Sequence, residues 1–104
     1  MFDKLMEAQQ KAGEVKQRLE AITVSGVAEG GKITVQANGN KVIKSVTIDE
    51  DFLKEADKEE LEELLVVALN KALEQAENVS QSEMAAMTSA MLGSMGGLGN
   101  FFGK

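Results

Sequence analysis

The 104-residue sequence contains no cysteine, histidine, tyrosine, tryptophan or proline. Without cysteine there is neither a disulfide nor a thiolate metal site, which favours a reducing compartment. Without histidine the chain lacks the commonest general base and the commonest neutral metal ligand. An enzyme built from this sequence would have to use carboxylates, lysine, serine or threonine. The composition therefore favours a binding or structural protein over an enzyme.

Acidic and basic residues are segregated along the chain. The net charge of -6 ordinarily argues against a nucleic acid as partner. However, residues 49–63 hold nine acids and two lysines, whereas residues 30–48 hold three lysines and no acid. The acidic run does not match a calcium loop, because its fifth and sixth positions are Leu53 and Lys54. We therefore expect no metal site, and the placement of the bases matters more than their number.

Changes in hydrophobic period predict the first four elements. Residues 3–22 carry a narrow apolar stripe with gaps of three and four, which predicts a helix. Residues 23–48 read as three strands, separated by turns at 29–31 and 38–40, where Gly and Asn would tolerate positive φ. Lys44 interrupts the alternation of the third strand. Either a β-bulge or an exposed strand end would explain that interruption.

A second long helix is predicted after the strands. Asp57 and Glu60 have the spacing of a capping box, and a broad apolar face follows that extends through methionines to Met95. The element order α-β-β-β-α predicts an α+β domain over residues 1–92, in which a three-stranded antiparallel meander is flanked by long N- and C-terminal helices. Residues 93–104 are Gly-rich and are expected to form a flexible tail.

The apolar stripes of the two helices exceed what one short chain buries, which predicts a homodimer. We expect its interface to include Leu5, Ala12, Val15, Leu19, Ile33 and Val35.

Basic residues recur along the first predicted helix. Lys4, Lys11 and Arg18 are seven apart and form one slowly drifting stripe beside the apolar seam, with Lys16 on the other flank. Acids stand four positions before Lys11 and Arg18, the favourable order for intrahelical ion pairs. The pattern alone is therefore typical of a solvated helix face, and a polyanion-binding surface is the alternative.

Three sequence pieces identify a family. They are the "ANGN" turn before the "VTID" strand end, the Ala68-x-Asn70-x-Ala72 core of the last helix, and the Met- and Gly-rich end. With them, nearly the whole chain resembles the YbaB/EbfC nucleoid-associated DNA-binding proteins. Members of that family often have proline after the "ID" and in the tail, and this chain has neither.

The resemblance implies a small cytoplasmic, nucleoid-located homodimer of tweezer-like shape, without catalytic activity or cofactor. Such proteins bind duplex DNA through projecting helices and are implicated in nucleoid organisation and gene regulation. We expect low sequence specificity, because phosphate contacts do not read bases. The candidate DNA-binding residues are Lys4, Lys11, Lys16, Arg18, Lys32, Lys41 and Lys44.

A protein-interaction module is the alternative function, with a partner docked on the methionine-rich C-terminal helix. Neither a small-molecule substrate nor a membrane is expected as a partner. The charge-free run from Met84 to Gly103 contains too much Gly, Ser, Thr and Asn for a convincing membrane span.

Overall fold

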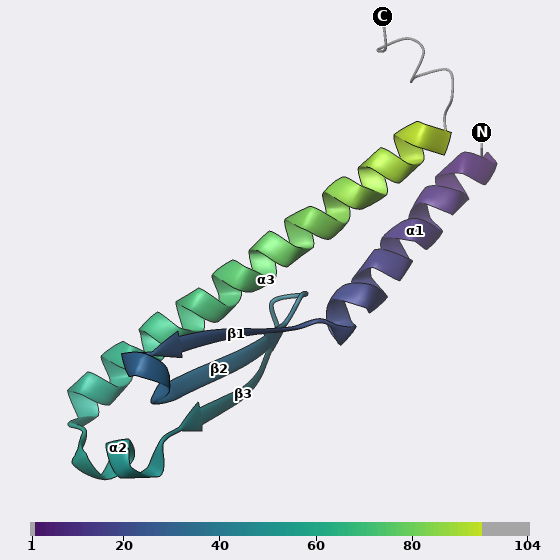
Figure 1. The fold of residues 1–104 in the computed structure, drawn as a ribbon. Coiled ribbons are helices and arrows are strands. Elements are labelled where there is room, and N and C mark those ends of the chain that lie inside the picture. Colours follow the sequence, from purple (N-terminus) through teal and green to yellow (C-terminus); the bar gives the residue numbers. More distant parts are fainter. Residues whose placement is uncertain (1, 95–104) are drawn as a thin grey trace, which may run out of the picture.

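The structure, a computed structural model, describes the backbone of residues 2–94 and the side chains of residues 5–7 and 9–93. Its elements are α1 (Phe2–Ala21), β1 (Thr23–Ala28), the 3₁₀ turn η1 (Glu29–Gly31), β2 (Ile33–Asn38), β3 (Ile43–Ile48), α2 (Glu50–Glu55) and α3 (Lys58–Ser94). The strands form an antiparallel sheet in the order β1-β2-β3 (Figure 1). The predicted α+β fold, with a three-stranded meander between two long helices, is confirmed.

The short helix α2 was not predicted. Its N-cap is Asp49, whose carboxylate accepts a hydrogen bond of 3.0 Å from the backbone N–H of Phe52. The acidic run from residue 49 to residue 63 therefore contains two helix starts and not one. Asp49 precedes α2, and Asp57, the first residue of the predicted capping box, precedes α3.

The core lies between α3 and one face of β1 and β2. Alternate residues of β2 point toward the helix, and Ile33 and Val35 are fully buried there. Gly26 of β1 lies directly beneath α3: a Cβ atom at that position would stand 2.2 Å from the Ala68 carbonyl oxygen and 2.3 Å from the Ala72 nitrogen. Small side chains at Ala68 and Ala72 are thus explained by packing, since larger side chains there would hold α3 away from the sheet.

The turn between β2 and β3 forms where it was predicted, but for a different reason. The buried Asn38 carboxamide oxygen accepts hydrogen bonds from the N–H groups of Asn40 (2.9 Å) and Val42 (3.2 Å). The positive φ of this turn falls on Lys41, at 66°. Gly39 is required by contact instead, because a Cβ there would stand 2.9 Å from the backbone carbonyl oxygen of Leu19. The expectation that Gly and Asn supply the positive φ is therefore wrong for this turn.

A β-bulge explains the position of Lys44. Gln36 pairs with Ser45 across β2 and β3, whereas the next residue, Ala37, pairs with Ile43. Lys44 is the extra residue between those pairs, so the first of the two alternatives holds.

The molecule is elongated, with dimensions of 63 × 28 × 16 Å. Its radius of gyration is 19.6 Å, against about 13 Å for a compact domain of this length. Helix α1 runs beside the C-terminal part of α3, beyond the sheet (Figure 1). We call α1 together with residues 83–94 of α3 the arm. Buried Val15 and Leu19 hold α1 in place.

The predicted boundary between domain and tail is not tested. Helix α3 continues to Ser94, and the remaining Gly-rich segment, residues 95–104, lies outside the described residues.

Replacing Gly26 with alanine should lower the free energy of unfolding by about 1–3 kcal/mol or more, because the added methyl group overlaps the α3 backbone. Gly13→Ala is the matched control. No atom lies within 4 Å of a Cβ at Gly13, and its position inside α1 predicts a gain of about 0.5–1 kcal/mol. Urea denaturation of the two variants measures the difference. Equal stability of Gly26→Ala and the unaltered protein would contradict the close packing.

Candidate functional site

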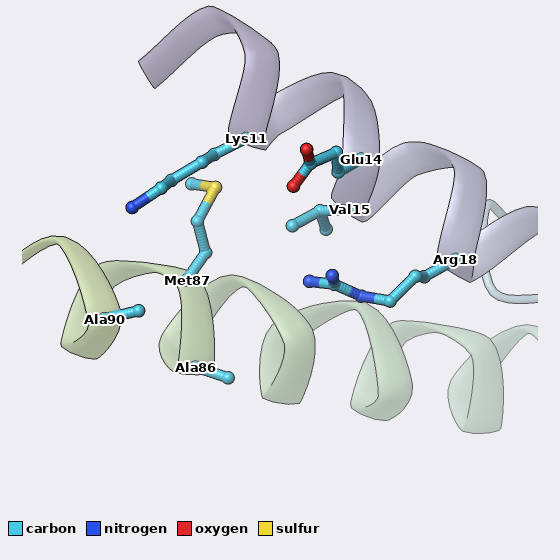
Figure 2. Close-up of a pocket in the computed structure, with 7 residues that line it drawn as sticks. All are labelled: Lys11, Glu14, Val15, Arg18, Ala86, Met87 and Ala90. Carbon is cyan, nitrogen blue, oxygen red and sulfur yellow. The ribbon is translucent and has the colours of Figure 1, made fainter. Parts of the chain in front are cut away.

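An open groove of about 180 Å³ separates α1 from α3 (Figure 2). Its lining consists of Lys11, Glu14, Val15 and Arg18 from α1 and Ala86, Met87 and Ala90 from α3. The small side chains Ala86 and Ala90 leave this space open on the α3 side. Figure 2 shows Lys11 and Arg18 extending from α1 toward α3. Their seven-residue spacing therefore brings both charges to one side of the arm.

The two bases of the groove have different acidic partners. Lys11 pairs with Glu7 on its own helix at 3.8 Å, which confirms that predicted intrahelical pair. Arg18 was expected to pair with Glu14 in the same way. Instead its Nε atom donates a hydrogen bond of 3.2 Å to Oε2 of Glu83 on α3. Arg18 therefore connects the two helices of the arm.

The turn between β2 and β3 brings a second pair of bases together. The Asn40 side chain donates a hydrogen bond of 3.0 Å to the carbonyl oxygen of Lys16, which places the turn against α1. The next residue, Lys41, forms an ion pair with Glu77 of α3. The sequence placed Lys16 and Lys41 in separate elements, and the fold brings the backbone of Lys16 against the turn that carries Lys41, at the base of the arm.

Glu77 is held between two donors. Besides its pair with Lys41, its Oε1 atom accepts a hydrogen bond of 3.1 Å from the Gln81 side chain. The hydrogen bond from Lys41 lowers the pKa of the Glu77 carboxyl below its usual value, and the Gln81 hydrogen bond and the Lys41 charge act in the same direction. Glu77 is therefore ionised throughout the neutral range.

Of the remaining candidate bases, Lys32 and Lys44 lie apart from the groove. Lys32 precedes β2 at the opposite end of that strand from the turn, and its Nζ atom pairs with Asp49 at 3.9 Å. Lys44 lies exposed on the bulge of β3. The backbone of Lys4 belongs to α1, but its side chain lies outside the described residues. The seven candidates thus do not form one continuous surface.

The acidic run is well separated from the arm. Residues 49–63 form α2 and the first turns of α3, at the end of the molecule opposite the N-terminal end of α1 (Figure 1). Acids in the first turn of a helix are favoured by its dipole, so this placement has a structural cause. In the part of α3 that belongs to the arm, Glu83 is the sole charged residue.

The expected dimer-interface residues lie in two different environments. Ile33 and Val35 are covered by α3, and Val15 and Leu19 are buried in the same chain. These four side chains have almost no surface left to bury against a second copy. Leu5 and Ala12, by contrast, are exposed on the arm.

Exposed apolar side chains that the sequence analysis did not single out occur on β3 and directly before it. Val42 before the strand is 48% exposed, and Ile43 and Val46 of β3 are 37% and 45% exposed. Ile43 and Val46 pair with buried Ala37 and Val35, so they point to the face of the sheet that α3 covers elsewhere. Strand β3 therefore lies beyond the edge of the helix.

Two further properties concern residues 2–94. No helix in this range has the length and apolar character that crossing a bilayer requires. The same residues contain no cluster of three or more acidic, histidine or cysteine side chains suited to a metal ion.

Comparisons with known proteins agree on one family. A sequence model of the YbaB/EbfC DNA-binding family matches residues 1–91. A nucleoid-associated protein of Flavobacterium johnsoniae is 36% identical over 102 residues, which cover 98% of this chain and 94% of that protein. A nucleoid-associated protein of Thermus thermophilus is 39% identical over 109 aligned positions, covering 99% and 96%.

A solved structure shares the fold. The crystal structure of an uncharacterized Helicobacter pylori protein superposes with a TM-score of 0.74 and 21% sequence identity. The match covers 83% of this chain and 90% of that one.

Replacing Lys41 with asparagine, a residue that tolerates the positive φ at this position, should raise the pKa of Glu77 toward its usual value. Carboxyl NMR titration of the two proteins measures this shift. Because folding lowers this pKa, the stability that the pair adds is present at neutral pH and is lost as the pH falls through the titration of Glu77. Lys71→Gln, which removes a charge from α3 without disturbing the pair, is the control. An unchanged titration in Lys41→Asn would contradict the assignment.

Proposed function

Because the chain belongs to the YbaB/EbfC DNA-binding family, we propose that it binds duplex DNA through the arm and the adjoining turn. The supporting observation is the separation of charge along the molecule. Lys11 and Arg18 lie in the groove of the arm, and Lys16 and Lys41 lie at its base. The role is that of a nucleoid-associated binding protein without catalytic chemistry, located in the nucleoid.

Distance and salt explain how an acidic protein binds a polyanion. The molecule is 63 Å long, whereas charges in physiological salt are screened over about 8 Å. Along α3 the acidic run ends at Glu63, twenty residues before Glu83, so about 30 Å of helix, roughly four screening lengths, separates it from the groove. The arm itself carries four bases and five acids, so the side to which its bases point, rather than any net charge, governs the encounter.

The proposed contacts predict little sequence preference. Lysine and arginine side chains on one side of a helix reach phosphates, which fix position without reading bases. Base stacking on aromatic rings has no support in the described side chains, among which Phe52 of α2 is the sole aromatic residue. Binding of this kind suits a role in nucleoid organisation, with effects on gene regulation through occupancy of DNA.

We also propose that the protein acts as a homodimer. The exposed apolar side chains of β3 lie on an edge strand, and edge strands with apolar side chains pair readily with another chain. Exposed Val66 of α3 adds to this surface. It lies on the same side of α3 as Glu77, and Glu77 pairs with Lys41, directly before β3, so this side of the helix borders β3. Pairing through Val46 and Val66 would project two arms from one centre, which matches the tweezer-like shape.

Removal of the two positive charges of the groove should weaken binding to DNA. In Lys11→Gln/Arg18→Gln, the slope of log affinity against log salt should fall by about one for each lost phosphate contact. The unaltered protein, with six or more contacts in a dimer, should lose about three decades of affinity between 50 and 200 mM salt. Fluorescence anisotropy of labelled duplexes of unrelated sequence measures both quantities.

The control Lys54→Gln/Lys58→Gln removes the same charge from the acidic end of the molecule. It should change the affinity and the salt slope much less than the groove variant does. Equal losses in the two variants would contradict the arm as the DNA contact. Absence of binding even at 50 mM salt would contradict the proposed function and favour docking of a protein partner on the exposed Met84 and Leu92.

Val46→Glu should convert the dimer to a monomer, because it places a charge in the proposed apolar interface while the position is already exposed in one chain. Light scattering gives the mass, and circular dichroism confirms that the fold is kept. Val67→Glu is the control, since Val67 is also exposed but lies about 100° around α3 from Val66. A dimeric Val46→Glu would exclude this interface.

A further inference from the structure

Two of the proposed DNA contacts are occupied by carboxylates of the same helix. Arg18 reaches Glu83 from α1, and Lys41 reaches Glu77 from the turn between β2 and β3. The two glutamates are six residues apart, which places them about 9 Å apart along the axis of α3. Helix α3 thus offers one carboxylate to each of two bases that come from other elements.

We propose that Glu77 and Glu83 set the DNA affinity of the protein by occupying Lys41 and Arg18 in the free state, so that DNA phosphates must displace them. This inference rests on the proposed function, because it concerns the same bases. Glu77 and Glu83 are then intramolecular competitors of the ligand rather than contacts to it.

The exposure of both pairs suits displacement. The Arg18 and Lys41 side chains are 54% and 50% exposed, and those of their partners 28% and 41%. Pairs in such surroundings are individually weak, so an incoming phosphate can replace either carboxylate without unfolding the arm. They are nevertheless strong enough to change an affinity severalfold.

Glu77 is oriented for this role. The hydrogen bond from Gln81, one turn further along α3, fixes one carboxylate oxygen. The other oxygen is paired with Lys41. Glu77 is ionised at neutral pH as any glutamate of ordinary pKa is, and the hydrogen bond from Lys41 lowers its pKa further.

Competition by Glu77 and Glu83 favours the binding of dense polyanions over the binding of single anions. Duplex DNA carries one charge per about 1.7 Å of its axis and can supply phosphates to Arg18 and Lys41 together. A free phosphate ion replaces one carboxylate at a time. Lys16, which has no ion pair within the described residues, is available for the first encounter.

Neutralising the two competitors should tighten DNA binding. Glu77→Gln and Glu83→Gln should each raise the affinity about two- to fivefold, and the double variant by about the product, the range expected when a partly exposed ion pair no longer has to be broken. Glutamine keeps the size and helix propensity of glutamate. Anisotropy with a random duplex at 100 mM salt measures the gain.

The matched control is Glu63→Gln/Glu74→Gln, which removes two charges from exposed, unpaired positions of α3. It should change the affinity by clearly less than the double variant does. An equal gain would show that net charge alone acts, and would overturn the inference. A loss of affinity in Glu77→Gln/Glu83→Gln would also overturn it, and would mean that the carboxylates position the bases.

A double-mutant cycle tests whether each glutamate acts through its partner. The gain from Glu83→Gln should vanish in an Arg18→Gln background, and the gain from Glu77→Gln in a Lys41→Asn background. Persistence of either gain would contradict the assigned pair.

Binding by the unaltered protein separates failure of this inference from failure of the proposed function. If that protein binds DNA with a steep salt dependence but the variants match the control, this inference alone fails, whereas no binding by any variant overturns the proposed function as well.

Discussion

No side chain separates α3 from β1 at Gly26, and Ala68 and Ala72 let the helix approach the backbone of the strand. This contact positions the helix over β1 and β2 and encloses Val35 between them. A helix about 10 Å wide covers about two strands spaced about 4.8 Å apart. Most of strand β3 is therefore left uncovered and Val46 is exposed on it, whereas Ile48 at its end packs against the core. The same contact that forms the core thus creates the apolar surface proposed to bind a second copy.

The length of α3 produces the arm. With 37 residues, the helix is about 55 Å long, whereas a strand of six residues spans about 20 Å. The helix must extend beyond the sheet, and α1 covers part of that extension through Val15 and Leu19. The acidic start of α3 and the bases of α1 are consequently held at opposite ends of one rigid element.

Local pattern predicted the elements well, but it did not predict their partners. The period of two identified residues 23–48 as strands, because it follows directly from strand geometry. The close contact of Gly39 with Leu19 and the pairing of Arg18 with Glu83 join residues far apart in the sequence, the latter 65 positions apart. No local period carries that information. Helix α2 was predictable in principle, since Asp49 is a recognisable cap.

The ion pairs change how the net charge of -6 should be understood. A carboxylate that already pairs with a base, such as Glu83, removes one positive contact in the free protein, yet it repels a phosphate less than an unpaired acid would. Once a phosphate displaces it, the freed carboxylate stands close to the bound DNA and opposes it. Affinity therefore depends on which acids lie beside the bases, and only weakly on the acids of α2. An acidic protein can thus bind DNA reversibly, with its own glutamates limiting how tightly it holds on.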